Sequence, residues 1–95
     1  MIPAPDSVRN NTAASRYELD AHGDLCIAAY RPRGDAFVFT HTQVPRALEG
    51  KGLGSRLIRG ALADVRAQGR TIVAECAFVA AYLARHPEER DLLAG

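Results

Sequence analysis

The short glycine-rich segment Gly50-Lys51-Gly52-Leu53-Gly54-Ser55 constrains the fold more than any other part of the sequence. It follows a segment rich in aromatic and β-branched residues, 36–44, and it opens a run in which apolar residues recur at helical spacing. A second β-branched segment, 71–76, comes after that run. Parallel neighbouring strands need a crossover connection, usually a helix, and such crossovers are almost always right-handed. The order therefore predicts a strand-helix-strand unit with two parallel strands.

Upstream of this unit the sequence predicts an antiparallel meander of three strands, at 16–22, 25–30 and 36–44. Polar and apolar residues alternate over 16–22, which is typical of a half-buried strand. The run 25–30 is continuously apolar and short, as in a strand covered on both faces. Turns are predicted between the strands at Gly23-Asp24 and Pro32-Arg33-Gly34-Asp35, because these residues favour turn conformations.

Two short helical segments are predicted downstream, at 77–85 and at 87–93, the second with its proline near the start. Gly69 is predicted to occupy the left-handed position that follows the C-terminus of the long helix. Gly60 lies inside the long predicted helix, where glycine costs about 1 kcal/mol relative to alanine. Its presence there indicates close packing against the sheet.

The length of 95 residues fits one domain, which we expect over residues 15–95. Residues 1–14 are rich in proline, asparagine, serine and threonine, and this composition predicts a flexible lead-in. Twelve Lys and Arg against eleven Asp and Glu leave a net charge of +1, without the basic excess of nucleic-acid-binding proteins. No apolar run is long enough to cross a bilayer, and no signal peptide is recognisable. We therefore expect a cytoplasmic protein whose two cysteines, Cys26 and Cys76, are free thiols, with Cys26 in the core.

The glycine-rich segment has the composition of an anion-binding turn at a helix N-terminus. Glycines let backbone N–H groups approach an anion without a Cβ atom in the way, and the helix dipole favours a phosphate there. The segment differs from the phosphate loop of nucleoside triphosphatases, because Lys51 is followed by Gly52. It also differs from the dinucleotide fingerprint, whose third glycine comes one residue later. A flexible connector is the alternative, but the strand-helix-strand context favours anion binding.

Four separated blocks resemble the small single-domain acetyltransferases of the GCN5-related superfamily, over about residues 16–94. The blocks are His41-Thr42-Gln43-Val44-Pro45, Gly50-Lys51-Gly52-Leu53-Gly54-Ser55 with its helix, Glu75-Cys76-Ala77-Phe78, and Arg85-His86-Pro87-Glu88. The resemblance implies a compact α/β fold that holds acetyl-CoA between two splayed parallel strands. It implies cofactor contacts from Val44, Gly50, Lys51, Gly52, Leu53, Gly54, Ser55 and Cys76, with the pyrophosphate on the amides of 50–55 and the pantetheine arm on the backbone of Val44. One residue departs from the pattern, since Glu49 stands where the superfamily usually has Gln or Arg.

Cys76 and His41 are the candidate catalytic residues. Cys76 is predicted at a strand end just before a helix, where the helix N-terminus lowers the pKa of a thiol. The resemblance implies that Cys76 lies near the acetyl group, where it would accept the acetyl, assist proton transfer or line the pocket. His41 is predicted on one strand face with Phe37, Phe39 and Gln43, and an imidazole with a pKa of about 6.5 suits removal of a proton from an ammonium. The structural alternatives are a buried core thiol and a hydrogen-bonded core or rim histidine.

The resemblance implies an N-acetyltransferase that moves an acetyl group from acetyl-CoA to an unidentified amine by direct attack in a ternary complex. The acceptor is a small molecule or a protein, and a monomer or weak homodimer is expected, with neither nucleic acid nor membrane as partner. No metal is expected, because the histidines and cysteines lack the spacing of a zinc site. A CoA-binding module with little or no catalysis is the first alternative, and a nucleotide-phosphate binder is the second. The segment 85–88 is either a helix stop with solvated charges or, as the resemblance suggests, a part of the chain that approaches the cofactor.

Overall fold

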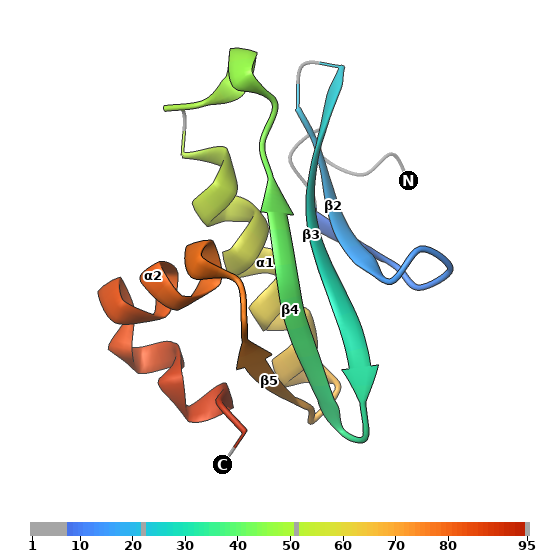
Figure 1. Cartoon of the computed structure of the whole chain (residues 1–95), viewed down its shortest axis with the longest axis vertical. Helices are drawn as coiled ribbons and strands as arrows, with labels where there is room; N and C mark the ends of the chain where they lie inside the picture. The colour runs from blue at the N-terminus through green and yellow to red at the C-terminus, as the bar shows by residue number, and fades with distance from the viewer. Residues whose placement is uncertain (1–7, 22, 51, 95) are drawn as a thin grey trace.

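A computed structural model of the chain, which describes residues 8–21, 23–50 and 52–94, shows a twisted sheet with helix α1 across one face (Figure 1). No helix among these residues is long and apolar enough to cross a bilayer. The elements in chain order are β1 (Val8–Asn11), β2 (Arg16–Ala21), β3 (Asp24–Arg33), β4 (Ala36–Gln43), the 3₁₀ helix η1 (Arg46–Leu48), α1 (Leu53–Ala67), β5 (Thr71–Ala74), α2 (Ala77–Arg85) and the 3₁₀ helix η2 (Pro87–Leu92).

The sheet has the strand order β1-β2-β3-β4-β5. Its first four strands form an antiparallel meander, and β4 pairs with β5 in parallel. The long connection between the two parallel strands is α1, whose apolar residues recur on one side because the sequence places them at helical spacing. The predicted α/β class, with a meander followed by a strand-helix-strand unit, is confirmed.

The prediction of a loose lead-in over residues 1–14 is wrong for β1. Val8 pairs with Leu19 of β2, so the chain begins to build the sheet before the predicted domain. The asparagines that indicated a loop find partners here, because the Tyr30 hydroxyl donates to Asn10 Oδ1 at 2.7 Å and Asn11 Nδ2 donates to the carboxylate of the β2 residue Glu18 at 3.0 Å. Pairing of this segment with β2 therefore produces a strand, although its composition is typical of turns. Residues 12–14 lie in the turn between β1 and β2, and residues 1–7 of the predicted lead-in lie outside the described residues.

Gly60 of α1 allows the close packing that its position in the sequence predicts. A Cβ atom at Gly60 would lie 2.5 Å from Val8 Cγ2 and 2.6 Å from Val8 Cβ. The element that packs against Gly60 is therefore β1, which the sequence did not predict as a strand. It could not approach α1 so closely if the helix carried a side chain at this position.

We expect Gly60→Ala to destabilise the protein by about 1 kcal/mol. Overpacking costs about 1–3 kcal/mol, and the better helix propensity of alanine offsets about 1 kcal/mol of that cost. Urea denaturation of both proteins measures the difference. In a Val8→Gly background the clash is gone, so the same substitution should become stabilising. A Gly60→Ala protein more stable than the wild type would show that β1 does not pack on α1 in this way.

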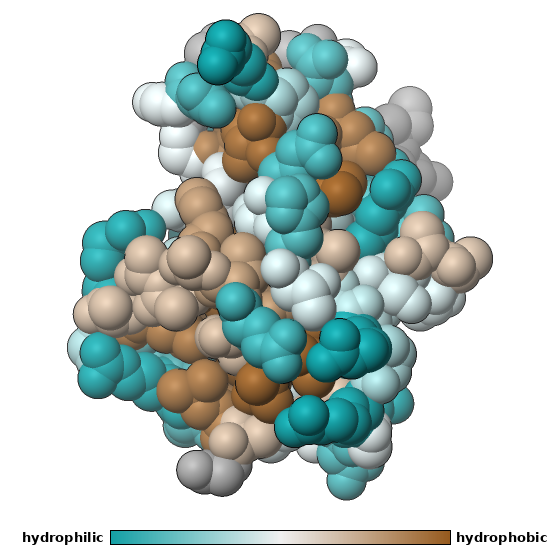
Figure 2. Space-filling view, viewed as in Figure 1, coloured by the Kyte–Doolittle hydropathy of each residue, from teal (hydrophilic) through white to brown (hydrophobic). Residues whose placement is uncertain are grey.

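Strand β3 is covered on one face only, which corrects the prediction that the run 25–30 is buried on both. Cys26, Ala28 and Tyr30 are buried in the core beside α1, whereas the alternate residues Leu25 and Ile27 are half-buried on the other face. Seen from the side opposite α1, the surface is a mosaic of hydrophobic and hydrophilic residues (Figure 2). The apolar run therefore has one fully buried face and one partly exposed face. The predicted core position of Cys26 is confirmed.

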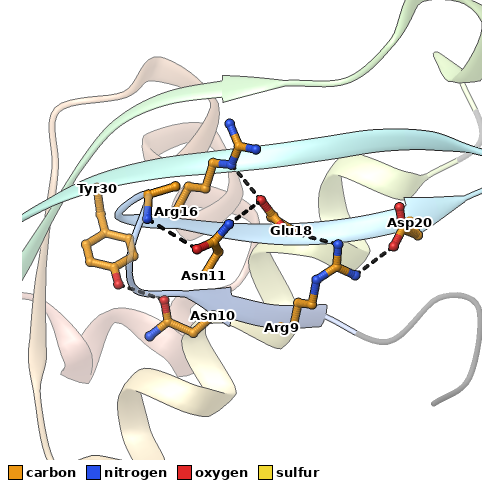
Figure 3. A network of polar contacts seen from close by, with 8 residues as sticks. Arg9, Asn10, Asn11, Arg16, Glu18, Asp20 and Tyr30 are labelled. Atoms are coloured by element: carbon orange, nitrogen blue, oxygen red, sulfur yellow. Dashed lines mark hydrogen bonds and ion pairs between the residues drawn. The ribbon is translucent and has the colours of Figure 1, made fainter. Parts of the chain in front are cut away.

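A buried carboxylate organises the β1-β2 end of this second face (Figure 3). Glu18 is only 4% exposed. Its two carboxylate oxygens form ion pairs with Arg9 Nη2 at 2.9 Å and with Arg16 Nε at 2.6 Å. One of them also accepts a hydrogen bond from the Asn11 side-chain amide. Arg9 bridges onward to Asp20 at 2.7 Å. The network satisfies a charge that would otherwise be costly to bury.

We expect the stability contributed by Glu18 to disappear in acid. Hydrogen bonds from Asn11 and Arg16 lower the pKa of Glu18 below its ordinary value, outweighing burial. The folded state therefore binds a proton less readily than the unfolded chain, so the contribution is complete above the unfolded pKa of about 4.3 and is lost as pH falls through the folded pKa. Urea denaturation at pH 7 and pH 3 should show Glu18→Gln less stable than wild type by about 1–3 kcal/mol at pH 7, with the gap closing at pH 3. A gap equal at both pH values would contradict this role of the Glu18 carboxylate.

Candidate active site

The two parallel strands stop pairing at the point where the candidate site begins. Their last paired residues are Phe39 and Ala74, after which β4 continues to Gln43 while β5 ends. The carbonyl oxygen of Phe39 accepts both the Glu75 N–H at 3.0 Å and the Cys76 N–H at 2.9 Å. The chain then turns into α2, so the strand predicted over 71–76 ends two residues early. Beyond this point β4 has no ladder partner on the β5 side among the described residues.

The glycine-rich turn connects η1 to α1 through two left-handed residues. Gly50 has φ +80° and Gly52 has φ +74°, conformations that side-chain-bearing residues rarely adopt. Gly52 is the N-cap of α1, so no side chain caps the helix, and no acidic residue stands in its first turn. The Arg56 N–H bonds to the Gly52 carbonyl at 3.1 Å, which leaves the N–H groups ahead of Arg56 without intrahelical partners. The turn therefore presents the positive end of α1 uncapped.

A pocket of about 250 Å³ opens over this helix end. Its walls come from the residue after β4, the end of η1, the turn, the first residues of α1, and α2. The lining residues are Val44, Leu48, Glu49, Gly50, Gly52, Leu53, Gly54, Ser55, Phe78 and Arg85.

Most of the residues predicted to bind the cofactor lie together in this pocket: Val44, Gly50, Gly52, Leu53, Gly54 and Ser55. The predicted residue Lys51 lies outside the described residues, and Cys76 is not part of this lining. Four of the described lining residues were not assigned to the cofactor from the sequence: Leu48 and Glu49 just before the turn, and Phe78 and Arg85 of α2. Only the docking of α2 beside α1 brings the two α2 residues here, and the signals for it in the sequence were the blocks 75–78 and 85–88 of the family resemblance.

Gly54 has a different role from the one its motif predicts. A Cβ atom at this position would lie 2.4 Å from Cζ of Phe78. Gly54 therefore makes room for the aromatic ring that walls the pocket, whereas Gly50 and Gly52 serve the backbone conformation of the turn. The motif thus combines a packing requirement with a conformational one.

Cys76 is the N-cap residue of α2 and is buried, with 9% of its surface exposed. Its Sγ atom lies 3.3 Å from the Thr42 hydroxyl oxygen. Burial raises the pKa of the Cys76 thiol, but the Thr42 hydroxyl and the backbone N–H groups of Val79 and Phe78 outweigh burial, so the pKa is lower than that of an ordinary cysteine. The structure therefore combines a thiolate-favouring environment with the end of the β4-β5 ladder.

His41 does not share a strand face with Phe37 and Phe39, so that prediction is wrong. The register between β3 and β4 shifts, because Tyr30 pairs with Phe39 while Ala29 pairs with His41. Thr40 is the extra residue, and beyond such a bulge the two faces exchange. Thr42 consequently points to Cys76 on the helix side, and His41 lies exposed on the opposite face. Strict alternation along the sequence cannot reveal this, because a bulge depends on pairing with the next strand.

The family model for the GCN5-related N-acetyl-transferase matches residues 16–92, which include β2 to η2 and all of the pocket. The chain belongs to the GCN5-related N-acetyltransferase family. The fold also resembles the NMR solution structure of a GCN5-like protein from Staphylococcus aureus, with a TM-score of 0.72 and 21% identity over 98% of this chain and 92% of that one. A search of curated proteins found no match.

Membership in the GCN5-related N-acetyltransferase family places the chain among the acyltransferases. It also confirms the family that the four sequence blocks resemble, and the S. aureus structure independently confirms the fold. Members of this family act on acetyl-CoA in general. The uncapped turn at the N-terminus of α1 fits such a group, because it offers backbone N–H groups and a helix dipole to a pyrophosphate.

Proposed function

We propose that this family member transfers the acetyl group of acetyl-CoA to an amine. The observation that carries the proposal is the pocket over the uncapped end of α1, where Gly50 and Gly52 hold the backbone in left-handed conformations. A helix N-terminus without a cap or an acidic first turn is suited to a dianionic pyrophosphate. Val44 and Phe78 add apolar side chains to the lining, which can pack on the methylene and methyl groups of the adjoining pantetheine arm.

In this proposal the pantetheine arm follows β4 from Val44 toward Cys76. The β4-β5 ladder stops at Phe39 and Ala74, so the backbone of β4 beyond Phe39 can bond to the amides of the arm. The thioester then lies near the Thr42 and Cys76 pair. A backbone N–H at this end of β4 polarises the thioester carbonyl, which stabilises negative charge as it develops on the oxygen.

The amine attacks the thioester carbon directly in a ternary complex. The new C–N bond forms, the C–S bond breaks, and the proton lost by the nitrogen passes to a base, while the CoA sulfur leaves as thiolate. Cys76, with its lowered pKa, is the proposed acceptor of that proton on the helix side. His41 remains a candidate on the opposite face of β4, where it is exposed and accessible to an amine.

The test begins with calorimetric titration of acetyl-CoA, with ATP and NAD as competitors. Saturable binding that neither competitor affects supports the cofactor site, whereas displacement by ATP or NAD favours a general nucleotide-phosphate site. Turnover is then measured with a panel of small amines, peptide N-termini and lysine peptides, by mass spectrometry of the acetylated product. Binding without transfer to any acceptor would leave the alternative of a CoA-binding module.

Alanine variants of Cys76 and His41, alone and together, assign the catalytic residues. Loss of a proton acceptor typically lowers turnover by about 10²–10⁴-fold, with little change in acetyl-CoA affinity. Intact mass spectrometry after incubation with acetyl-CoA shows whether Cys76 itself becomes acetylated, which would replace direct attack by a two-step transfer. If the double variant turned over the true acceptor at the wild-type rate, neither residue would be the base.

A further inference from the structure

The pocket over α1 contains two charged side chains of opposite sign among the described residues, Glu49 and Arg85. Glu49 lies in the turn itself, where a carboxylate repels a pyrophosphate held on the neighbouring amides. Arg85 is the last residue of α2 and approaches the same pocket from the other wall. Among the described residues of the lining, the cation therefore comes from α2.

Arg85 is also distinguished from most other arginines of the chain by what it contacts. Arg9, Arg16, Arg31 and Arg66 each pair with a carboxylate, and Arg90 donates to the Leu83 carbonyl. Within the described residues Arg85 makes neither an ion pair nor a hydrogen bond, and it is exposed. Its five N–H donors are thus free at the mouth of a pocket whose backbone is built to receive an anion.

The helix that carries Arg85 also relates it to the reacting end of the site. Helix α2 begins directly after Cys76 and ends at Arg85, nine residues later, which corresponds to about 14 Å along the axis. One rigid helix thus places a thiol at the end of the β4-β5 ladder and a guanidinium beside the glycine-rich turn. An elongated ligand with a reactive end and a phosphorylated end matches this arrangement.

We propose that Arg85 holds the pyrophosphate of acetyl-CoA, and so supplies from α2 a guanidinium that faces the acidic Glu49 across the pocket. The inference rests on the proposed function. A guanidinium can bond to two phosphate oxygens at once, and such charge-assisted pairs are stronger than neutral hydrogen bonds. Arg85 is in this sense a binding residue that positions the thioester and takes no part in proton transfer.

The experiment titrates Arg85→Gln, Arg85→Lys and wild-type protein with CoA and with 3′-dephospho-CoA in a calorimeter. Both ligands carry the pyrophosphate, and only CoA carries the 3′-phosphate. We expect Arg85→Gln to raise Kd about tenfold to a hundredfold for both ligands by the same factor, because charged hydrogen bonds are lost. Arg85→Lys should lose less, since it keeps the charge but not the two-pronged geometry. Circular dichroism verifies that each variant is folded.

Arg33→Gln is the matched control, because Arg33 is an exposed arginine at the far end of β3 and its replacement removes the same charge. Its Kd values should change by less than about twofold. A second test introduces a guanidinium at position 49 of the turn. Glu49→Arg in the Arg85→Gln background should recover most of the affinity for CoA that Arg85→Gln loses. Such recovery indicates that the two positions serve the same group.

Two outcomes would overturn the proposal while leaving the proposed function intact. One is an affinity of Arg85→Gln for CoA equal to that of the Arg33→Gln control. The other is a loss for CoA with none for 3′-dephospho-CoA, which would assign Arg85 to the 3′-phosphate. A folded wild-type protein that binds neither ligand would overturn the proposed function itself, and this inference with it.

Discussion

Replacement of Gly52 by glutamate is expected to weaken acetyl-CoA binding at least about a hundredfold, equivalent to about 2.7 kcal/mol. Two effects act together. The residue must keep φ +74°, which costs a side-chain-bearing residue about 1–2 kcal/mol. A Cβ atom at Gly52 meets no heavy atom within 4 Å, so the new carboxylate can reach the uncapped N–H groups of α1 and compete there with the pyrophosphate. Calorimetric titration with acetyl-CoA measures the loss.

Gly69→Glu separates these two effects. Gly69 follows the other end of α1, has φ +69°, and also has open space around its Cβ position. The substitution introduces the same side chain and a similar backbone strain but lies outside the pocket. Its affinity for acetyl-CoA should therefore stay within about twofold of wild type, even where thermal unfolding shows a comparable loss of stability. Equal loss of binding in both variants would show that strain or unfolding, and not the carboxylate at the helix end, removes the ligand.

Leu57→Ala is expected to destabilise the protein by about 2–5 kcal/mol, the range for truncating a buried leucine. Leu57 is fully buried in α1 and belongs to the single core that joins the sheet to both helices. A domain of this size has a total stability of about 5–15 kcal/mol, so a large share is lost. Urea denaturation at pH 7 gives the difference directly.

Leu93→Ala removes the same atoms from a side chain that is 40% exposed. Its cost should be below about 1 kcal/mol, because less apolar surface is taken from the core and the site can relax. The contrast between the two leucines tests the packing of α1 on the sheet. Similar costs at both positions would mean that the face of α1 bearing Leu57 is not the one that packs against the strands.

Local elements were predictable from the sequence with small errors at their ends. Helix α2 occupies the predicted residues Ala77–Arg85, and α1 begins at Leu53, directly after the glycine that caps it. Both follow from short-range preferences, namely apolar spacing, a helix-starting turn and a proline beyond the end. Strand β3 instead extends to Arg33, beyond the predicted turn proline, because pairing with β4 holds Pro32 and Arg33 in extended conformation.

The candidate site likewise contains residues that local sequence patterns identify and residues that only tertiary packing brings together. The glycine-rich turn was predictable from its own composition, and Val44 was implied by the family resemblance. Phe78 and Arg85 were not assigned to the pocket, because their positions depend on how α2 docks against α1. The partner of Cys76 was also hidden, since Thr42 reaches it only because the bulge at Thr40 exchanges the faces of β4.

The sequence by itself determined the meander of β2 to β4, the parallel strand-helix-strand unit and the glycine-rich turn at the start of α1, because each depends on residues close together in the chain. Only the tertiary structure decided that β1 joins the sheet, that Gly54 makes room for Phe78, and that His41 and Thr42 face opposite sides. These features arise from pairing and packing between distant segments, and the free energy of such contacts depends on neighbours that a local pattern does not contain.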